Sequence, residues 1–299
     1  MIATGIPVLP ELPPRLTSYV GIPLREDSTY TNAEGRDDKG IRKRGEKALE
    51  SIQEILRKVL EADEAVFYCA SAQKVPGVLE QLVLGWAAAY TGFGLLVLTN
   101  RRLFYFSMGK SGGWQKSLRM TRWGDIQQAK VSGFIRSKLR IRYQNGTSEG
   151  YWKIRGGDGK KIKQLLALFQ GAGGGEVSPA QGMTSVCPDC LKPLTLGVYE
   201  CSQCHLRFKD ERSLMRRALL IPGGGYFYVG YPGLGVLSLL GEGAETVLCV
   251  TLLIAAVGNN DPAPLVIAGL LLMLIVFLHK FVAIRHGRRF VREFIPLAN

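Results

Sequence analysis

Four of the six cysteines form two Cys-x-x-Cys pairs. Cys187 and Cys190 make the first pair, and Cys201 and Cys204 make the second pair after ten intervening residues. Two such pairs can place four thiolates tetrahedrally around one Zn²⁺ ion. Two disulfides are the competing arrangement, but residues 1–40 contain no apolar run of the kind that directs secretion. We therefore expect a reducing cytosol and a structural Zn²⁺ site rather than disulfides or iron.

The sequence contains no strong motif of the common enzyme classes. Gly109-Lys110-Ser111 matches the end of a phosphate-binding loop, but Phe104 stands where that loop needs its first glycine. A His-Glu-x-x-His metal motif is missing, and residues 109–113, which have the Gly-x-Ser-x-Gly spacing, are better explained by a hairpin turn. The chain has only three histidines, which leaves little for histidine-based catalysis. We therefore expect a protein without enzymatic activity.

The positive charge of the chain is concentrated in one stretch. Residues 99–163 contain 16 Lys and Arg against 3 Asp and Glu, and this surplus equals the whole formal charge of +13. Such a concentration favours phosphate-rich partners, either anionic lipid headgroups or nucleic acid. A well-solvated basic surface without a partner is the alternative.

Some of these cations are expected to share one face of a β-hairpin. Residues 138–143 alternate strictly between basic side chains and apolar or aromatic ones, which places the basic side chains on one face of a strand. Asn145-Gly146 marks the turn, and residues 151–154 form the return strand. We predict that the basic face contacts anionic lipid or an acidic protein partner. The predicted contact residues are Lys138, Arg140, Arg142 and Lys153.

The rest of the chain divides by composition. Residues 1–40 are rich in proline and polar residues and predict a flexible tail. Apolar positions recur at helical spacing in residues 41–61, which predicts an amphipathic helix. Short apolar runs alternate with turn signals in residues 62–170, as in an antiparallel sandwich or small barrel closed by one helix. Glycine-rich residues 171–186 predict a linker before the cysteine module at 187–208.

One compact motif lies at the centre of the strand-rich region. Leu98-Thr99-Asn100-Arg101-Arg102 runs into the aromatic segment Leu103-Phe104-Tyr105-Phe106. This pattern resembles bacterial pleckstrin-homology-like (PH-like) and GRAM-type domains over about residues 60–170. The resemblance implies a seven-strand sandwich or barrel with one C-terminal helix, generally non-enzymatic and used to bind lipids or proteins. The binding residues of such domains vary too much to be assigned to positions in this sequence.

An uncharged run precedes this motif. Residues 81–100 contain no charge, which is long enough to cross a bilayer. Gly85, Gly92 and Gly94, with the strand-like residues 95–98, favour a buried sheet instead.

Two long apolar segments near the C-terminus predict a membrane hairpin. Residues 265–284 are almost uninterrupted, with Lys280 able to reach the interface, and residues 233–257 provide a second span that includes Glu242 and Glu245. Carboxylates in such a span either face a protein interior, and can then mark function, or lie near an interface or a helix break. We favour the second arrangement because glycines flank Glu242.

The region 218–290 carries a second resemblance. Pro222-Gly223-Gly224-Gly225-Tyr226 and the residues that follow resemble the Pro-Gly-x-Gly-x-x-Tyr-x-Gly element that opens small bacterial two-span membrane modules, although Tyr231-Pro232 departs from that pattern. The cysteine module likewise resembles the zinc ribbons that precede membrane segments in many bacterial proteins. Neither resemblance assigns chemistry.

Basic residues flank the two apolar segments on their outer sides, while the intervening loop 258–264 has none. The positive-inside rule therefore predicts both ends of the chain in the cytoplasm. The resemblances to bacterial modules imply that the hairpin lies in the inner membrane of a bacterium. The fold expected is a multidomain α+β membrane protein with a PH-like sandwich or barrel, a zinc ribbon and a transmembrane hairpin. Its expected work is binding or scaffolding. The alternatives are a nucleic-acid binder that uses ribbon and sheet together, and a component of a membrane transport complex built on Glu242 and Glu245.

Overall fold

The computed structural model describes residues 16–77, 91–171, 177–257 and 262–297. The chain divides into two compact units, which we call the sheet unit and the helical unit. The sheet unit comprises Met1–Pro76, Gly92–Thr195 and Cys201–Leu206, and the helical unit comprises Gly77–Thr91, Leu196–Glu200 and Arg207–Asn299.

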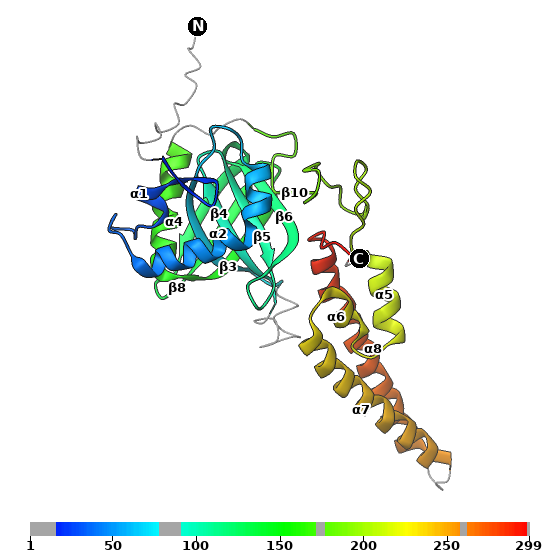
Figure 1. The fold of residues 1–299 in the computed structure, drawn as a ribbon. Helices are drawn as coiled ribbons and strands as arrows, with labels where there is room; N and C mark the ends of the chain where they lie inside the picture. Colours follow the sequence, from blue (N-terminus) through cyan, green and yellow to red (C-terminus); the bar gives the residue numbers. More distant parts are fainter. Residues whose placement is uncertain (1–15, 78–90, 172–176, 258–261, 298–299) are drawn as a thin grey trace. The chain divides into compact units, whose positions relative to one another are not determined.

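Seven consecutive antiparallel strands form the main part of the sheet unit (Figure 1). They are β3 (Val66–Lys74), β4 (Phe93–Thr99), β5 (Arg102–Met108), β6 (Trp114–Arg122), β7 (Ile126–Ser132), β8 (Arg136–Tyr143) and β9 (Ser148–Arg155). Strand β3 pairs with both β4 and β9, so the two meanders β3 to β6 and β7 to β9 join into one sheet. The helix α4 (Gly156–Gly171) follows the last strand.

The sheet curls around an inner core that α4 closes. The Tyr105 ring of β5 lies 5.1 Å from the Tyr151 ring of β9, although these strands are not neighbours in the sheet. Phe169 of α4 stacks on Trp123 at 4.6 Å and meets Phe67 edge-on. A large antiparallel sheet followed by a C-terminal helix agrees with the mixed α+β fold that the sequence predicted.

A second core lies on the outer face of β3 to β6. Helix α2 (Lys39–Val59) covers this face with Leu49, Ile52 and Leu56, and it begins where the Asp38 side chain accepts a hydrogen bond from the Ile41 amide at 2.9 Å. The predicted amphipathic helix at 41–61 is therefore present, shifted by two residues.

The prediction of a flexible tail for residues 1–40 is wrong where the structure describes this segment. Strands β1 (Leu16–Tyr19) and β2 (Ile22–Arg25) form a hairpin, and α1 (Glu26–Thr29) follows them. Ile22 and Leu24 are fully buried in the outer core, because they complete the cover that α2 begins. The alternation of buried and half-buried residues in β2 spans only four residues and includes Pro23, so it is too short to predict a strand. Residues 1–15 lie outside the described part of the chain.

Burial on both faces explains the uncharged run. In β4, Leu95 and Val97 enter the outer core while Leu96 and Leu98 enter the inner core. A strand covered on both faces needs apolar side chains at every position, so the usual alternation disappears. Residues 93–99 thus form the buried sheet that the sequence favoured, whereas residues 78–90 of the same region lie outside the described part.

The linker predicted at 171–186 is also partly structured. Strand β10 (Thr184–Val186) pairs antiparallel with β6, and Val186 belongs to the outer core. Upstream, the Ser178 amide and hydroxyl both donate to the Asp125 carboxylate at 2.7 Å. These contacts attach residues 177–186 to the sheet; residues 172–176 lie outside the described part.

In its described residues the helical unit contains two short and two long helices. They are α5 (Glu211–Leu220), α6 (Gly224–Val229), α7 (Pro232–Val257) and α8 (Ala263–Val291). Helices α7 and α8 pack along each other, and a small cluster that includes Leu214, Tyr228 and Phe290 packs at their base. After α8 the chain returns, and Phe208 forms an antiparallel bridge with Pro296.

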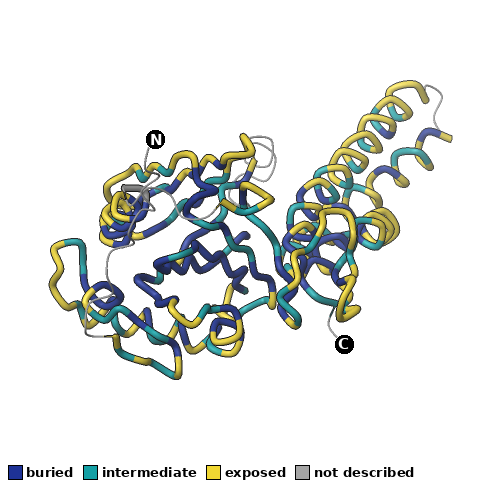
Figure 2. Tube along the Cα trace, turned by 90° about the horizontal axis from the view of Figure 1, so that it is seen from above, coloured by how far each residue is buried: buried dark blue, intermediate teal, exposed yellow. Residues whose placement is uncertain are grey.

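Helices α7 and α8 are long and apolar enough to cross a membrane, with mean hydropathies of 1.7 and 2.6 over their most apolar windows. Only 17% and 6% of those windows are buried, so most of their apolar side chains are exposed (Figure 2). The bounds agree with the spans predicted at 233–257 and 265–284, although α8 continues seven residues further, to Val291.

Candidate functional site

The four paired cysteines come together in the structure. All four Sγ atoms lie within 4.8 Å of one another, and the closest distances are 3.5 Å for Cys187–Cys204 and 3.4 Å for Cys190–Cys201. Each cysteine is a free thiol. Since a disulfide joins its sulfurs at about 2.05 Å, these distances do not describe disulfides.

The backbone of the two knuckles repeats. The Cys187 amide donates to the Lys192 carbonyl and the Cys201 amide to the Leu206 carbonyl, both at 2.9 Å. The residue after the second cysteine of each pair adopts a left-handed conformation, with φ of 62° at Leu191 and 58° at His205. Two identical turns thus present four sulfurs to one point.

The donor set fits a tetrahedral metal ion. Four ligands at about 2.3 Å from a central Zn²⁺ would lie about 3.8 Å apart, which falls among the sulfur distances observed. Burial raises the pKa of the Cys187 thiol. Burial also opposes ionisation of Cys201, but the amides of Cys204 and Gln203 donate to its sulfur and lower its pKa to about 6. Four thiolates leave no open coordination position, so the arrangement suits structure rather than catalysis.

The predicted basic face is present on β8. Leu139, Ile141 and Tyr143 are buried in the inner core, so the alternating basic residues project outward. Arg140 and Arg142 are exposed, and Lys138 is half-buried. The strand thus carries three of the four predicted contact residues on one surface.

A β-bulge decides where the fourth predicted residue lies. The register shifts between Ser137 and Leu139, which pair with Ile154 and Tyr151 respectively. Trp152 and Lys153 therefore both lie opposite Lys138, and Lys153 has a φ of 56°. Because two residues face one at a bulge, strict alternation fails on β9. Lys153 is half-buried and its Nζ lies 5.5 Å from the centre of the Trp152 ring.

Strand β7 and the ends of β8 and β9 add cations that the sequence analysis did not select. Lys130 pairs across the strands with Arg140, and Arg136 pairs with Arg155. Strand β7 is hard to predict from its sequence, because only Ile126 of its residues is a buried apolar side chain. We call Lys130, Arg136, Lys138, Arg140, Arg142, Lys153 and Arg155 the basic face.

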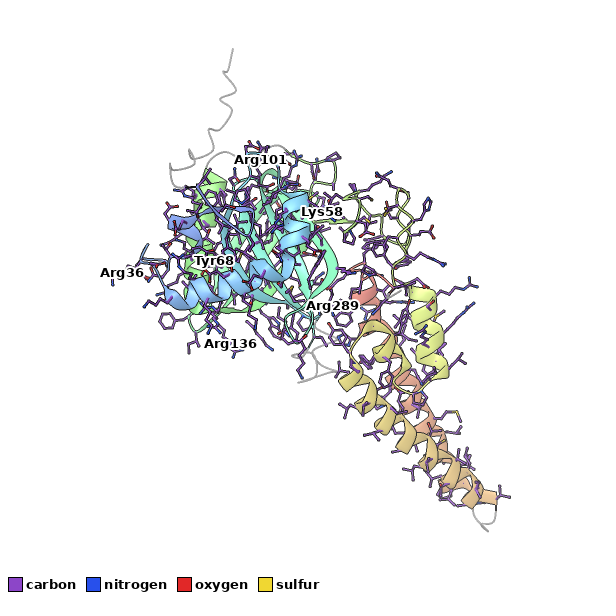
Figure 3. All side chains as sticks on the ribbon, viewed as in Figure 1. Arg36, Lys58, Tyr68, Arg101, Arg136 and Arg289 are labelled. Carbon is purple, nitrogen blue, oxygen red and sulfur yellow. The ribbon has the colours of Figure 1, made fainter. Side chains whose placement is uncertain are left out.

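Like charges lie opposite each other on the basic face. Cross-strand pairs of the same sign are destabilising, and here they occur as Lys130 with Arg140 and Arg136 with Arg155. In the described ranges no carboxylate forms an ion pair with these four side chains. The electrostatic effect reaches Lys153, where burial and the charge of Arg136 both lower the pKa. Arg136 projects from the domain in Figure 3.

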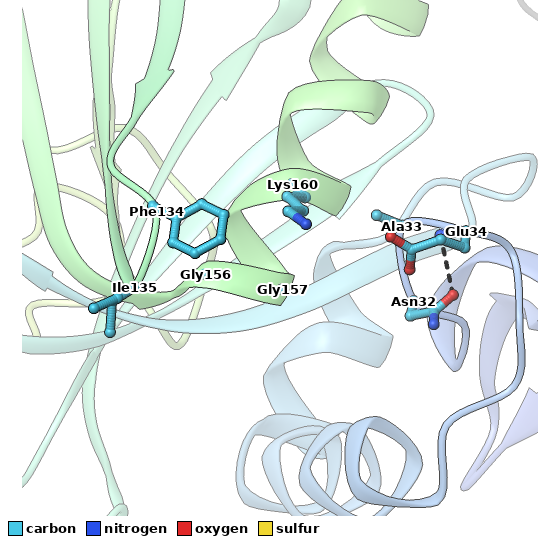
Figure 4. Close-up of a pocket in the computed structure, with 8 residues that line it drawn as sticks. All are labelled: Asn32, Ala33, Glu34, Phe134, Ile135, Gly156, Gly157 and Lys160. Carbon is cyan, nitrogen blue, oxygen red and sulfur yellow. Dashed lines mark hydrogen bonds between the residues drawn. The ribbon is translucent and has the colours of Figure 1, made fainter.

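A small cavity of about 440 Å³ opens beside the loop between β7 and β8 (Figure 4). Phe134 and Ile135 line it from that loop, and Lys160 lines it from α4. The opposite wall comes from the turn before α2. The remaining lining residues are Asn32, Ala33, Glu34, Gly156 and Gly157.

The Thr-Asn-Arg-Arg motif fastens the turn between β4 and β5 to the segment before β3. The Thr99 hydroxyl donates to Glu64 at 2.6 Å, and Arg102 forms a buried ion pair with the same carboxylate and donates to the Val59 carbonyl at 2.9 Å. Asn100 accepts from the Ala65 amide at 2.9 Å. The motif is therefore structural, and its two arginines are not part of the basic face.

Residues 60–153 match the family model described as Bacterial PH domain. No curated protein and no solved structure matches the chain. The matched segment runs from the residues before β3 into β9, so the sheet unit contains a PH-like domain, as the resemblance in the sequence implied.

A buried ionic cluster lies inside the PH-like domain. Glu149 pairs with Arg119 at 2.7 Å and with Lys74 at 3.4 Å, and it accepts from the Tyr151 hydroxyl at 2.7 Å. Burial opposes ionisation of this carboxylate, but the Arg119 and Lys74 charges outweigh it and hold the pKa of Glu149 well below its usual range. This cluster could not be predicted from the sequence, because Lys74 and Arg119 are far from Glu149 along the chain.

The two carboxylates of α7 face α8. Glu242 is 3% exposed and forms an ion pair with Lys280 at 2.6 Å, and the Gly223 amide donates to it at 3.4 Å. Glu245 contacts His279 Nδ1 at 3.0 Å. The arrangement favoured from the sequence was a position near an interface or a helix break, and the break is wrong because α7 continues through the flanking glycines. Lys280 is held by Glu242 rather than free to reach an interface.

Proposed function

We propose that the protein is a non-enzymatic, membrane-anchored binding protein of the bacterial inner membrane. In this proposal α7 and α8 cross the bilayer with both ends of the chain in the cytoplasm, and the four cysteines hold one structural Zn²⁺. The PH-like domain is the binding part, and its basic face contacts anionic lipid headgroups.

The like-charge pairs on the basic face carry the proposal. Lys130 lies opposite Arg140, and Arg136 lies opposite Arg155, so the two charges of each pair repel each other. The described chain offers these side chains no carboxylate within ion-pair distance. An anionic surface would relieve this repulsion, whereas water and salt only screen it. A surface kept only for solubility would gain from interspersed acidic residues.

The expected strength follows from the number of cations. Each Lys or Arg near an anionic leaflet contributes about 1 kcal/mol, so the four residues predicted from the sequence would provide about 4 kcal/mol. The membrane helices of the same chain would keep the domain near the bilayer, where such a weak interaction becomes effective through high local concentration. The interaction falls as ionic strength rises.

The test is lysine footprinting of the full-length protein in vesicles. A membrane-impermeant acylating reagent would modify the protein in phosphatidylcholine vesicles and in vesicles that also contain phosphatidylglycerol, at low and high salt. We expect protection of Lys130 and Lys138 in anionic vesicles at low salt only. Lys58, an exposed residue of α2, is the control and should react equally in all samples.

A charge-reversed variant completes the test. Arg140→Glu with Arg142→Glu changes two exposed side chains, so the fold should persist while protection of Lys138 in anionic vesicles disappears. Equal modification of Lys130 and Lys138 in both vesicle types would contradict lipid binding. Protection that appears only after addition of an acidic protein would instead assign the face to a protein partner.

A further inference from the structure

The loop between β7 and β8 exposes two adjacent large apolar side chains. Phe134 is 81% exposed and Ile135 is 83% exposed, whereas Val177, the next most exposed large apolar residue among those described in the sheet unit, is 51% exposed. Single apolar residues on a surface are ordinary, but two neighbours at the tip of a hairpin form a small apolar projection.

This projection is fixed in place by backbone contacts. The Ile135 carbonyl accepts from the Gly156 amide at 3.0 Å, which attaches the loop to the start of α4. Gly133 has a φ of 95°, where L side chains are strained. A Cβ at Gly156 would lie 2.1 Å from the Phe134 carbonyl oxygen. These contacts hold the loop against the start of α4.

Cations surround the apolar tip. Arg136 and Arg155 form the cross-strand pair directly beside it, and Lys160 Nζ lies 5.7 Å from the centre of the Phe134 ring. Glu34 lines the far wall of the neighbouring cavity and is the one carboxylate among its lining residues. Within the described chain, Arg136, Arg155 and Lys160 form no ion pair with Glu34 or with another carboxylate.

An apolar tip ringed by cations is complementary to one kind of surface. The headgroup region of an anionic bilayer offers phosphates at the depth of the cations and acyl chains just below them. A soluble acidic protein would match the cations, but it would also need an apolar pocket to receive the two projecting side chains. Helices α7 and α8, which are long and apolar enough to cross a membrane, belong to the same chain.

We propose that Phe134 and Ile135 insert into the interface of an anionic bilayer while Arg136, Arg155 and Lys160 contact lipid phosphates. This inference rests on the proposed function and specifies how the domain engages lipid: the basic face lies along the headgroups and the loop between β7 and β8 enters the layer beneath them. Removing the two apolar side chains should then weaken membrane contact without changing the charge.

The experiment uses the full-length protein in vesicles with brominated lipid. Phe134→Trp keeps an aromatic ring at the tip, and its emission is obtained by difference from the wild type, which has four tryptophans. We expect a blue shift and loss of roughly half of the difference emission when brominated phosphatidylglycerol is present, because interfacial residues reach 5–10 Å into the headgroup and acyl boundary. Leu168→Trp, on the partly exposed side of α4, is the matched control and should lose little.

A second measurement separates this inference from the proposed function. If Phe134→Trp is not quenched while Lys130 and Lys138 stay protected in anionic vesicles, the basic face contacts headgroups without insertion of the loop. This result refutes the inference and leaves the proposed function standing. Loss of both signals refutes both. Insertion is supported if Phe134→Trp is quenched and if the double variant Phe134→Ser with Ile135→Ser shows weaker protection of Lys130 and Lys138. A blue shift that depends on protein concentration and not on lipid charge would assign the tip to a second copy of the chain and overturn insertion.

Discussion

Substitution of Glu149 by glutamine should strongly destabilise the PH-like domain. The carboxylate neutralises Arg119, whose side chain is 12% exposed, and it also contacts Lys74 and the hydroxyls of Tyr151 and Tyr143. Glutamine keeps the volume and can still accept a hydrogen bond, but it leaves the Arg119 charge buried without a counter-charge. Loss of one partner of a buried ion pair costs about 3–5 kcal/mol.

The assay is thermal unfolding of the full-length protein in detergent, followed by tryptophan fluorescence. For a domain of this size 1 kcal/mol corresponds to about 2–4 °C, so we expect Tm to fall by about 10 °C. Asp27→Asn is the control, because the Asp27 side chain is 51% exposed and its ion pair with Arg25 should contribute less than about 1 kcal/mol.

The pH dependence gives an independent check. The folded state lowers the pKa of Glu149 below its usual value, so its stabilising effect is present above the unfolded pKa of about 4.3 and is lost as the pH falls toward the folded value. The difference in Tm between wild type and Glu149→Gln should therefore shrink below about pH 4. A difference under 1 °C at pH 7, or one that is constant with pH, would show that the pair does not stabilise the domain.

Three further predictions concern the cysteines and the helical unit. Protein purified without added metal should contain one Zn²⁺ per chain by elemental analysis, and Cys190→Ser should lower that content; absence of zinc with four titratable thiols would contradict the site. Glu242→Gln should lower Tm in detergent more than Glu245→Gln, because it leaves the ion partner of a nearly buried carboxylate without a counter-charge; equal effects would count against this ranking. Reporter fusions after Asn299 should give cytoplasmic activity and fusions at Asn260 periplasmic activity, and the reverse pattern would exclude the proposed orientation.

The sheet could be predicted from the sequence mainly where one face is polar. Strand β8 alternates visibly, so its basic side chains were placed correctly. Strand β4 is buried on both faces and loses its alternation, and for this reason its sequence is compatible with a membrane span as well as with a strand. The burial of Ile22 and Leu24 could not be predicted from the sequence. These two side chains pack on the outer face of β3 to β6, and that face exists only after the sheet has formed.

The candidate sites divide in the same way. The cysteine pairs are local in sequence, so their spacing was enough to predict that four sulfurs meet. The tip at Phe134 and Ile135 could have been noticed as an apolar pair after Gly133 in a basic stretch, but only the structure shows that both side chains are exposed. The partners of Glu242 and Glu245 lie on the next helix, and sequence spacing does not determine which residues of two packed helices meet.

The pairing of β10 with β6 has a consequence for how the protein can be divided. Residues 60–153 match a domain family, yet this segment by itself would lack α4 from the inner core and α2 and β2 from the outer core. It would also leave residues 118–120 of β6 without the partner strand that Thr184–Val186 provide in the whole protein. An open strand edge beside exposed apolar surface promotes self-association. A soluble fragment should therefore begin before β1 and extend at least through Leu206, and shorter fragments should aggregate on expression.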